Sequence, residues 1–302
     1  MSGSRTEMLF IDGVYYRMLD ELPPLRPIAR GIAQAGSFAL ASGWRRNLLF
    51  NAGLALGPSS SSLQRTRCAY RMLGAMQRFI GEVIASRHLA ADELRARVVR
   101  FEGTAEYLAA RSLRRGVVIT GIHMGSFEPA LAMLRGLEKR VHVLFHPDAM
   151  PRFERARREL RARLGVVEHR VSDGLAAWSG LLDALNADEA VVIHADRTMP
   201  GQAGTRMPFL GLPDAELPPG PLRLAASAGS PIIPTFCARI PGGLHIWADG
   251  WIDTQCEKLT AADVAKHPAQ LALVAAMERA IRRYPDQWMA FADLRGEGRN
   301  SP

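Results

Sequence analysis

A histidine and a glutamate at a short spacing are the residues of this sequence best suited to chemistry. His123 and Glu128 lie within residues 121–129, with Ser126 between them. Five residues apart on one continuous helix, they would point about 140° away from each other. A helix that begins at Ser126 instead leaves His123 in a loop that can fold back onto the carboxylate. Such a pair fixes the imidazole tautomer and predicts a general base for a hydroxyl or an amine.

Two other chemistries could use residues of the same region. A Ser126 nucleophile is disfavoured because the G-x-S-x-G turn that exposes such a serine is absent. A metal site can be composed by residue type from four side chains: His123, His146, His194 and Asp196. The chain has no HExxH pattern or other close ligand pair, so we expect no metal.

Short apolar runs rich in β-branched residues precede most of these side chains. We expect strands at 117–121, 141–145, 166–171, 190–194 and 232–238. We expect helices at 63–99, 127–137, 152–164, 176–187, 221–228 and 261–284. The alternation predicts an α/β fold with a mostly parallel central sheet covered by helices on both faces, and a site at the carboxyl ends of the strands. Residues 1–110 are expected to form an N-terminal helical, membrane-facing region, and residues 111–302 an α/β core, together one integrated domain.

Composition excludes several classes of protein. The 302 residues are 48% hydrophobic and 23% charged, without a repeat, which excludes intrinsic disorder and fibrous or solenoid folds. Three widely spaced cysteines without a CxxC pair exclude a disulfide framework and a thiolate zinc site, and favour a reducing compartment. The net charge is +8 and Lys139, Lys258 and Lys266 are the only lysines, so the basic surface is made of arginine. It suits nucleic acid, anionic lipid or an acidic protein.

The N-terminal region contains an apolar stretch at 28–44. Arg30, Gln34 and many small residues make it too polar to span a membrane. We also expect no signal peptide, because no charged segment leads into an apolar one with a cleavage site. The Arg45–Arg46 pair that follows is typical of a helix lying in a membrane interface, although an ordinary core helix fits the pattern equally.

Several blocks that occur in order between about residues 45 and 295 carry a family resemblance. They are Arg46-Asn47-Leu48, the His-x4-Glu of 123–128, Ile193-His194-Ala195-Asp196-Arg197, Pro208-Phe209-Leu210-Gly211, residues 219–225, residues 229–234 with Arg239, and Tyr284-Pro285-Asp286-Gln287-Trp288. With these blocks the sequence resembles the bacterial lipid A late acyltransferases, the lauroyl and myristoyl transferases, which are related to the glycerophospholipid acyltransferases. It departs from them in lacking a membrane-spanning N-terminal helix and in having Arg197 where the family typically has Gln.

The resemblance implies acyl transfer from an acyl thioester to a hydroxyl or amine of a lipid or lipid-like acceptor. No acyl-enzyme and no cofactor are implied; the donor is carried on acyl carrier protein or coenzyme A. His123 and Glu128 would be catalytic. The expected substrate contacts are Gly125, Ser126, Arg158, Asp196, Arg197, Arg223 and Arg239. The implied location is peripheral, on the cytoplasmic face of the inner membrane.

Other segments have both a functional and a structural interpretation. The arginine-rich helix at 152–164 is either a landing patch for phosphorylated head groups or carrier protein, or a solvated, salt-bridged helix. Met72, Met76 and Phe79 line an acyl channel or belong to the core. For Gln287 and Trp288 we expect packing. The competing functions are a catalytically inactive membrane scaffold and a basic nucleic-acid-binding protein. No nucleic-acid-binding motif occurs in the sequence, so we expect no nucleic-acid partner.

Overall fold

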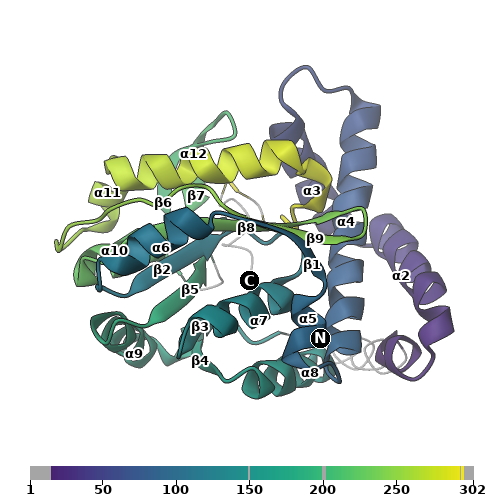
Figure 1. Ribbon diagram of the computed structural model, residues 1–302. Coiled ribbons are helices and arrows are strands. Elements are labelled where there is room, and N and C mark those ends of the chain that lie inside the picture. The colour runs from purple at the N-terminus through teal and green to yellow at the C-terminus, as the bar shows by residue number, and fades with distance from the viewer. Residues whose placement is uncertain (1–14, 149, 199–201, 293, 296–302) are drawn as a thin grey trace.

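A mostly parallel sheet organises the computed structural model, which describes residues 15–148, 150–198, 202–292 and 294–295 (Figure 1). Among these residues seven strands pair in the order β1-β9-β8-β2-β5-β3-β4. The strands are β1 (Val98–Glu102), β2 (Val117–Gly121), β3 (Val141–Phe145), β4 (Val166–Arg170), β5 (Ala190–His194), β8 (Ile232–Ile240) and β9 (Gly243–Ala248). Five strands from β8 to β4 run parallel; β9 is antiparallel to β8, and β1 is parallel to β9. A separate hairpin consists of β6 (Thr205–Phe209) and β7 (Leu212–Leu217).

Helices connect these strands and add an N-terminal layer. The N-terminal helices are η1 (Pro23–Leu25), α2 (Arg26–Leu40), α3 (Ser42–Leu56), α4 (Ser62–Ser86) and α5 (Ala91–Arg95). The helices of the core are α6 (Thr104–Ser112), α7 (Phe127–Leu137), α8 (Pro151–Arg163), η2 (Val171–Asp173), α9 (Leu175–Asn186), α10 (Gly220–Ala228), α11 (Ala261–Val264), α12 (Pro268–Arg283) and η3 (Pro285–Gln287).

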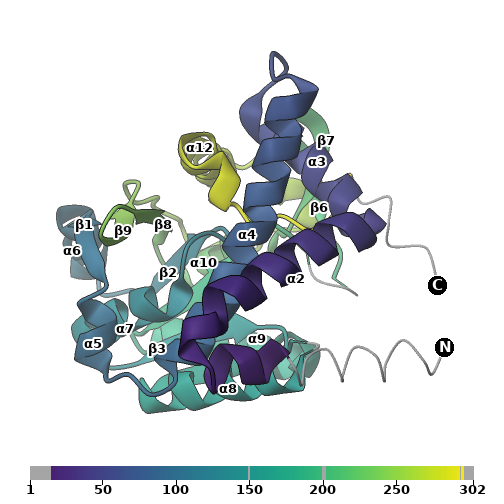
Figure 2. The same ribbon diagram turned by 90° about the vertical axis from the view of Figure 1, so that its right-hand side faces the viewer.

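The two faces of the sheet have separate apolar cores. Helices α6, α7 and α8 lie on one face, and α9, α10 and α12 on the other, as Figures 1 and 2 show. Strand β2 is buried along its whole length, and its side chains alternate: Val117 and Ile119 join the core under α7, whereas Val118 joins the core with α10. The predicted fold class is thereby confirmed, with helices on both faces of a mostly parallel sheet.

The N-terminal helices pack across the end of the sheet where β2 leads into α7. Helix α4 begins at a capping box in which Ser61 and Gln64 exchange hydrogen bonds of 2.7 and 3.2 Å. It contacts α2, α3, α8 and η3. Helix α2 lies outermost, against α4 and α3 (Figure 2). No helix within the described ranges is long and apolar enough to cross a membrane.

Two predicted helices are wrong in their boundaries. The helix expected over 63–99 ends at Ser86, and β1 begins at Val98. The helix expected over 261–284 is two helices, because Pro268 lacks an amide hydrogen and starts α12 instead of continuing α11. The apolar stretch 28–44 is divided between α2 and α3 at Ala41. Strands β1, β9 and the β6–β7 hairpin were not predicted.

Candidate active site

The His123 imidazole is held by Asp196, which follows the neighbouring strand β5. Because β2 and β5 are parallel and register Gly121 with His194, the two loops that follow them lie side by side. His123 Nδ1 is 2.7 Å from Asp196 Oδ1, and the His123 backbone N–H donates to Asp196 Oδ2 at 3.1 Å. An ionised carboxylate only accepts, so Nδ1 carries the proton and Nε2 remains a proton acceptor. This is the geometry of a general base.

Trp288 completes the setting of this carboxylate. Its indole Nε1 donates to Asp196 Oδ2 at 2.9 Å, and the side chain is fully buried. Met124 and Trp288 form an antiparallel bridge, and the Met289 N–H donates to the His123 carbonyl at 2.8 Å. The C-terminal segment therefore fixes both the carboxylate and the histidine loop. From the sequence we expected only packing for Trp288. Its place in the block Tyr284-Pro285-Asp286-Gln287-Trp288 was the one feature of the sequence that pointed to a role at the site.

Glu128 does not contact His123 through a hydrogen bond, so the expected pairing is corrected. Helix α7 begins after Ser126, as expected, but Glu128 is turned into the protein with 1% of its surface exposed. Neither of its carboxylate oxygens has a hydrogen-bond partner among the described residues. Burial raises the pKa of Glu128, against the opposing positive charges of Arg161 and Arg157.

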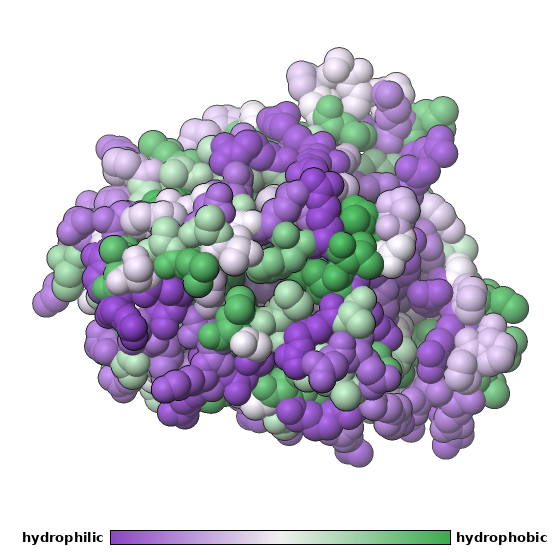
Figure 3. Space-filling model, in the orientation of Figure 1, coloured by the Kyte–Doolittle hydropathy of each residue, from purple (hydrophilic) through white to green (hydrophobic). Residues whose placement is uncertain are grey.

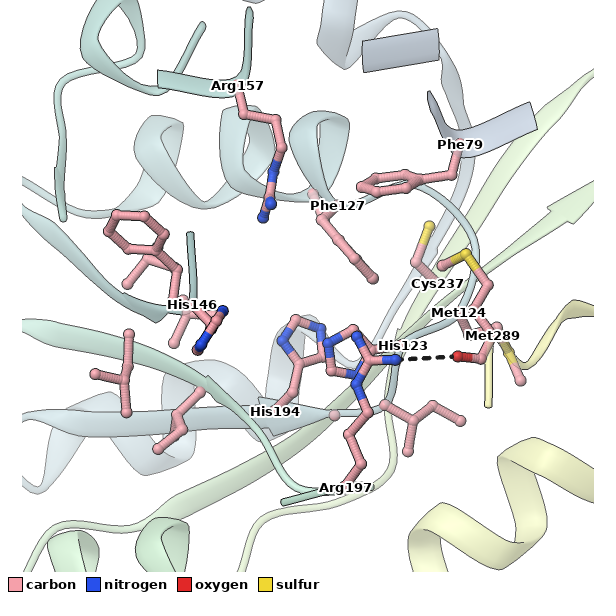
Figure 4. A pocket seen from close by; sticks show the side chains of 18 of the residues that line it. Phe79, His123, Met124, Phe127, His146, Arg157, His194, Arg197, Cys237 and Met289 are labelled. Atoms are coloured by element: carbon pink, nitrogen blue, oxygen red, sulfur yellow. Dashed lines mark hydrogen bonds between the residues drawn. The ribbon is translucent and has the colours of Figure 1, made fainter. Parts of the chain in front are cut away.

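Apart from Asp196, neutral and cationic groups surround the His123 ring (Figure 4). The His194 ring stacks on it with 4.3 Å between centroids, and Phe127 lies against both. Burial, the charge of Arg197 and that of Arg157 lower the pKa of His123, while Asp196 opposes the shift. Burial and the neighbouring His123 hold the pKa of His194 well below its ordinary value. Both imidazoles are therefore neutral bases at neutral pH.

Arg197 stands beside the two histidines with unused hydrogen-bonding capacity. Its Nη1 donates to the Met289 carbonyl at 3.4 Å, and its buried Nε has no partner among the described residues. Burial lowers the pKa of Arg197, which nevertheless remains a cation. A cation here provides a donor for negative charge that develops near His123.

A large cavity of about 1920 Å³ opens next to His123. It runs from α2 and the start of α9 to the face of the sheet beneath α7, and apolar side chains dominate its wall. Met76 and Phe79 line it, as one interpretation of the sequence expected, whereas Met72 is buried in the core. His146, Arg157, Arg161 and Arg223 add polar groups. A site of this size and character suits a long apolar ligand with a polar end.

Only some of the predicted substrate contacts lie in the cavity wall. Arg197 and Arg223 line the cavity, as does the predicted catalytic residue His123. Arg158 is exposed and lies outside it; its neighbour Arg157 points into the cavity instead, with a buried Nε that has no partner among the described residues (Figure 4). On helix α8 one position rotates a side chain by about 100°, so adjacent arginines face different surroundings.

Four of the predicted substrate contacts are not part of the cavity wall: Gly125, Ser126, Asp196 and Arg239. Arg239 pairs with Glu82 and donates to the Gly125 carbonyl at 3.4 Å. Gly125 has φ +70°, and a Cβ there would lie 2.3 Å from the Cys237 carbonyl oxygen. Ser126 occupies the N-cap position of α7 without a capping hydrogen bond. The structure thus gives these residues contacts that shape the His123 loop.

The four residues of the metal alternative do not come together. Asp196 and His194 lie with His123, but His146 Nδ1 is 2.8 Å from the Pro147 carbonyl. No group of three or more metal-ligating side chains occurs in the part of the chain that the structure describes.

Comparison with known proteins identifies the family of the chain. No curated protein is similar enough in sequence to be matched to the chain. The family model described as bacterial lipid A biosynthesis acyltransferase matches residues 14–294, nearly the whole sequence and every element of the site. The chain therefore belongs to the bacterial lipid A biosynthesis acyltransferase family, whose reaction is acyl transfer onto a lipid.

Proposed function

We propose that this protein transfers a fatty acyl chain from a thioester on acyl carrier protein or coenzyme A to a hydroxyl or amine of a lipid acceptor, as a late O-acyltransferase of lipid A type. The observation that carries the proposal is the His123–Asp196 pair at the wall of a large apolar cavity. No cofactor besides the thioester substrate is needed.

His123 acts on the acceptor. Its Nε2 takes the proton of the acceptor hydroxyl while the oxygen attacks the thioester carbonyl carbon, and Asp196 stabilises the resulting imidazolium. Collapse of the tetrahedral intermediate breaks the C–S bond, and the imidazolium returns its proton to the leaving thiolate. The transfer is direct, so no acyl-enzyme forms.

Two arginines supply the positive charge that this reaction requires. Arg197, whose side chain lines the cavity beside His123, would donate to the developing oxyanion. Arg157 points into the cavity from α8 and would bind an anionic group of the acceptor or of the donor carrier. Glu128 interacts with the charges of Arg157 and Arg161, so its contribution to catalysis would be to hold these guanidinium groups.

The mouth of the cavity would face a membrane surface. On α2 and at the start of α3, Ile32, Leu40 and Trp44 line this mouth and are 66%, 86% and 46% exposed. Leu175 at the start of α9 follows the cavity-lining Gly174 and is 82% exposed. On α3, Arg46 follows Trp44 by two residues and is also exposed. Apolar side chains with adjacent arginines favour peripheral attachment to an anionic leaflet, which in the cell is the cytoplasmic face of the inner membrane.

The test is transfer of a labelled acyl group by the purified full chain, with thioesters of both carriers and a total lipid extract in anionic vesicles. We expect His123→Ala to lose activity by about 10² to 10⁴. His88→Ala is the matched control, because His88 is exposed and outside the cavity. Wild-type protein that transfers nothing, or His123→Ala with full activity, would overturn the proposal. Wild-type protein that does not float with anionic vesicles would overturn membrane attachment alone.

A further inference from the structure

A second arm of the cavity leads from the His123 region along the underside of α7. One face of α7 is open to it, with residues at helical spacing that are not fully buried: Ala130, Met133, Leu134 and Leu137. Cys237 on β8 and Ile246 and Ala248 on β9 form the opposite wall. Apolar side chains gather on this side of the molecule beside β1 and α7 (Figure 3). The arm is therefore an apolar groove between α7 and the sheet.

Tyr107 of α6 stands at the far end of this groove. Its ring lines the cavity and is 8% exposed. Its hydroxyl donates to Glu138, which pairs with Arg111 at 2.7 Å, and Arg111 pairs with Asp188 at 2.6 Å. These contacts hold the ring in place.

The backbone beside Tyr107 is equally constrained. Gly103 precedes α6 with φ +98°, and a Cβ there would lie 2.5 Å from the Ala248 Cβ. The start of α6 therefore packs closely against β9, and this packing limits movement of the Tyr107 ring away from the groove.

We propose that this groove binds the acyl chain of the donor and that the Tyr107 ring sets the maximum chain length. The inference rests on the proposed function and specifies where its acyl substrate lies. The eleven residues of α7 from Phe127 to Leu137 give the groove a length of about 15 Å, which suits a medium-length saturated chain.

Chain length then follows from contact at the end of the groove. Each methylene that is buried strengthens binding about fourfold. A chain that reaches Tyr107 gains nothing from a further methylene, since the ring blocks it. Activity should rise with chain length up to one value and then fall.

The first test measures kcat/KM for a series of saturated acyl thioesters that differ by two carbons. Tyr107→Ala should move the optimum to longer chains and raise the preference for the next longer donor about tenfold. Tyr107→Phe keeps the ring and should keep the optimum. Leu108→Ala, on the exposed side of α6, is the matched control. An unchanged optimum in folded Tyr107→Ala, judged by circular dichroism, would overturn the inference.

A second test does not depend on turnover. An unreactive thioether analogue of the donor, with a photoreactive group at the end of its chain, is crosslinked to the wild-type protein and the labelled peptides are identified. Label in peptides containing residues 101–107 or 133–137 supports the groove, even if wild-type transfer fails. Label confined to α2 or α4, or no label above background, overturns the groove while leaving the transfer reaction to its own assay.

Discussion

Asp196 and Glu128 are two carboxylates with the same degree of burial and opposite surroundings. Each has 1% of its surface exposed. Asp196 accepts hydrogen bonds from the His123 ring, the His123 backbone and the Trp288 indole, whereas both oxygens of Glu128 lack a partner among the described residues. Burial alone would raise both pKa values. The contacts with His123 and the charge of Arg197 overcome this at Asp196 and lower its pKa; the pKa of Glu128 is raised.

The contrast shows that the carboxylate that orients the His123 ring need not be the glutamate of the His-x4-Glu motif. A carboxylate that stays ionised can fix a histidine tautomer and stabilise an imidazolium, as Asp196 does. A buried carboxyl group without hydrogen-bond donors favours its protonated form. Nearby arginines or a bound substrate can shift it toward the ionised form. We therefore assign Asp196 to the His123 ring and Glu128 to the arginines of α8.

The largest effect is expected from Asp196→Asn. An amide can donate to His123 Nδ1, which would place the proton on Nε2 and remove the general base. We expect kcat to fall on the order of 10²- to 10⁴-fold. Steady-state kinetics check this, with circular dichroism to show that the variant folds. Activity within a factor of a few of wild type would show that His123 does not depend on Asp196.

Glu128→Gln should act on different parameters. We expect about a tenfold loss of kcat/KM, mainly in KM, because an amide, unlike the carboxyl group, cannot ionise to balance the charges of Arg157 and Arg161. The acid limb of the pH–rate profile, which reports His123, should stay in place. A loss of kcat as large as that of Asp196→Asn would instead make Glu128 the partner of His123 during turnover.

The same variant has a second signature in its stability. A raised folded-state pKa means that the contribution of Glu128 to stability is present below its unfolded pKa and is lost as pH rises through the folded value. Glu128→Gln should therefore gain stability relative to wild type as pH increases. Denaturant midpoints measured across this range test the sign, and a difference that is independent of pH would contradict it.

The fold was largely readable from the sequence, since buried parallel strands are continuous apolar runs. The runs at 117–121, 141–145 and 190–194 coincide with β2, β3 and β5. Strand β1 was hidden because it lies at the sheet edge and its last four residues are exposed. Edge strands have little hydrophobic pattern, so propensity did not distinguish Val98–Glu102 from the end of a helix.

The site was readable in its residues but not in their pairing. His123 and Asp196 both follow strands, and the rule for parallel sheets places them at one edge. Which carboxylate the ring meets depends on the register of β2 with β5, and no local pattern in the sequence encodes it. For a similar reason the sequence did not indicate that Arg157, and not Arg158, lines the cavity, because the rotation of α8 about its axis is set by tertiary packing.

The smallest effect expected at the Asp196 side of the comparison is that of Trp288→Phe, which removes one donor and keeps an aromatic ring. Asp196 Oδ2 then keeps only the His123 backbone N–H, so the carboxylate becomes a stronger partner for the imidazolium. The pKa of His123 should rise, and the acid limb of kcat/KM should move to higher pH, with about a tenfold loss of activity.

A merely structural role for Trp288 predicts something else. The fully buried side chain leaves a cavity when it is shortened, which lowers stability by about 1 to 3 kcal/mol whatever the pH. Phe209→Leu is the matched control, because Phe209 packs edge-on against Trp288 with 6.1 Å between centroids but does not touch Asp196. If both variants lose stability and only Trp288→Phe moves the acid limb, the indole acts through Asp196. If both leave the acid limb unchanged, the indole donor at Asp196 does not control the base, and the distinction between Asp196 and Glu128 rests on the His123 hydrogen bonds alone.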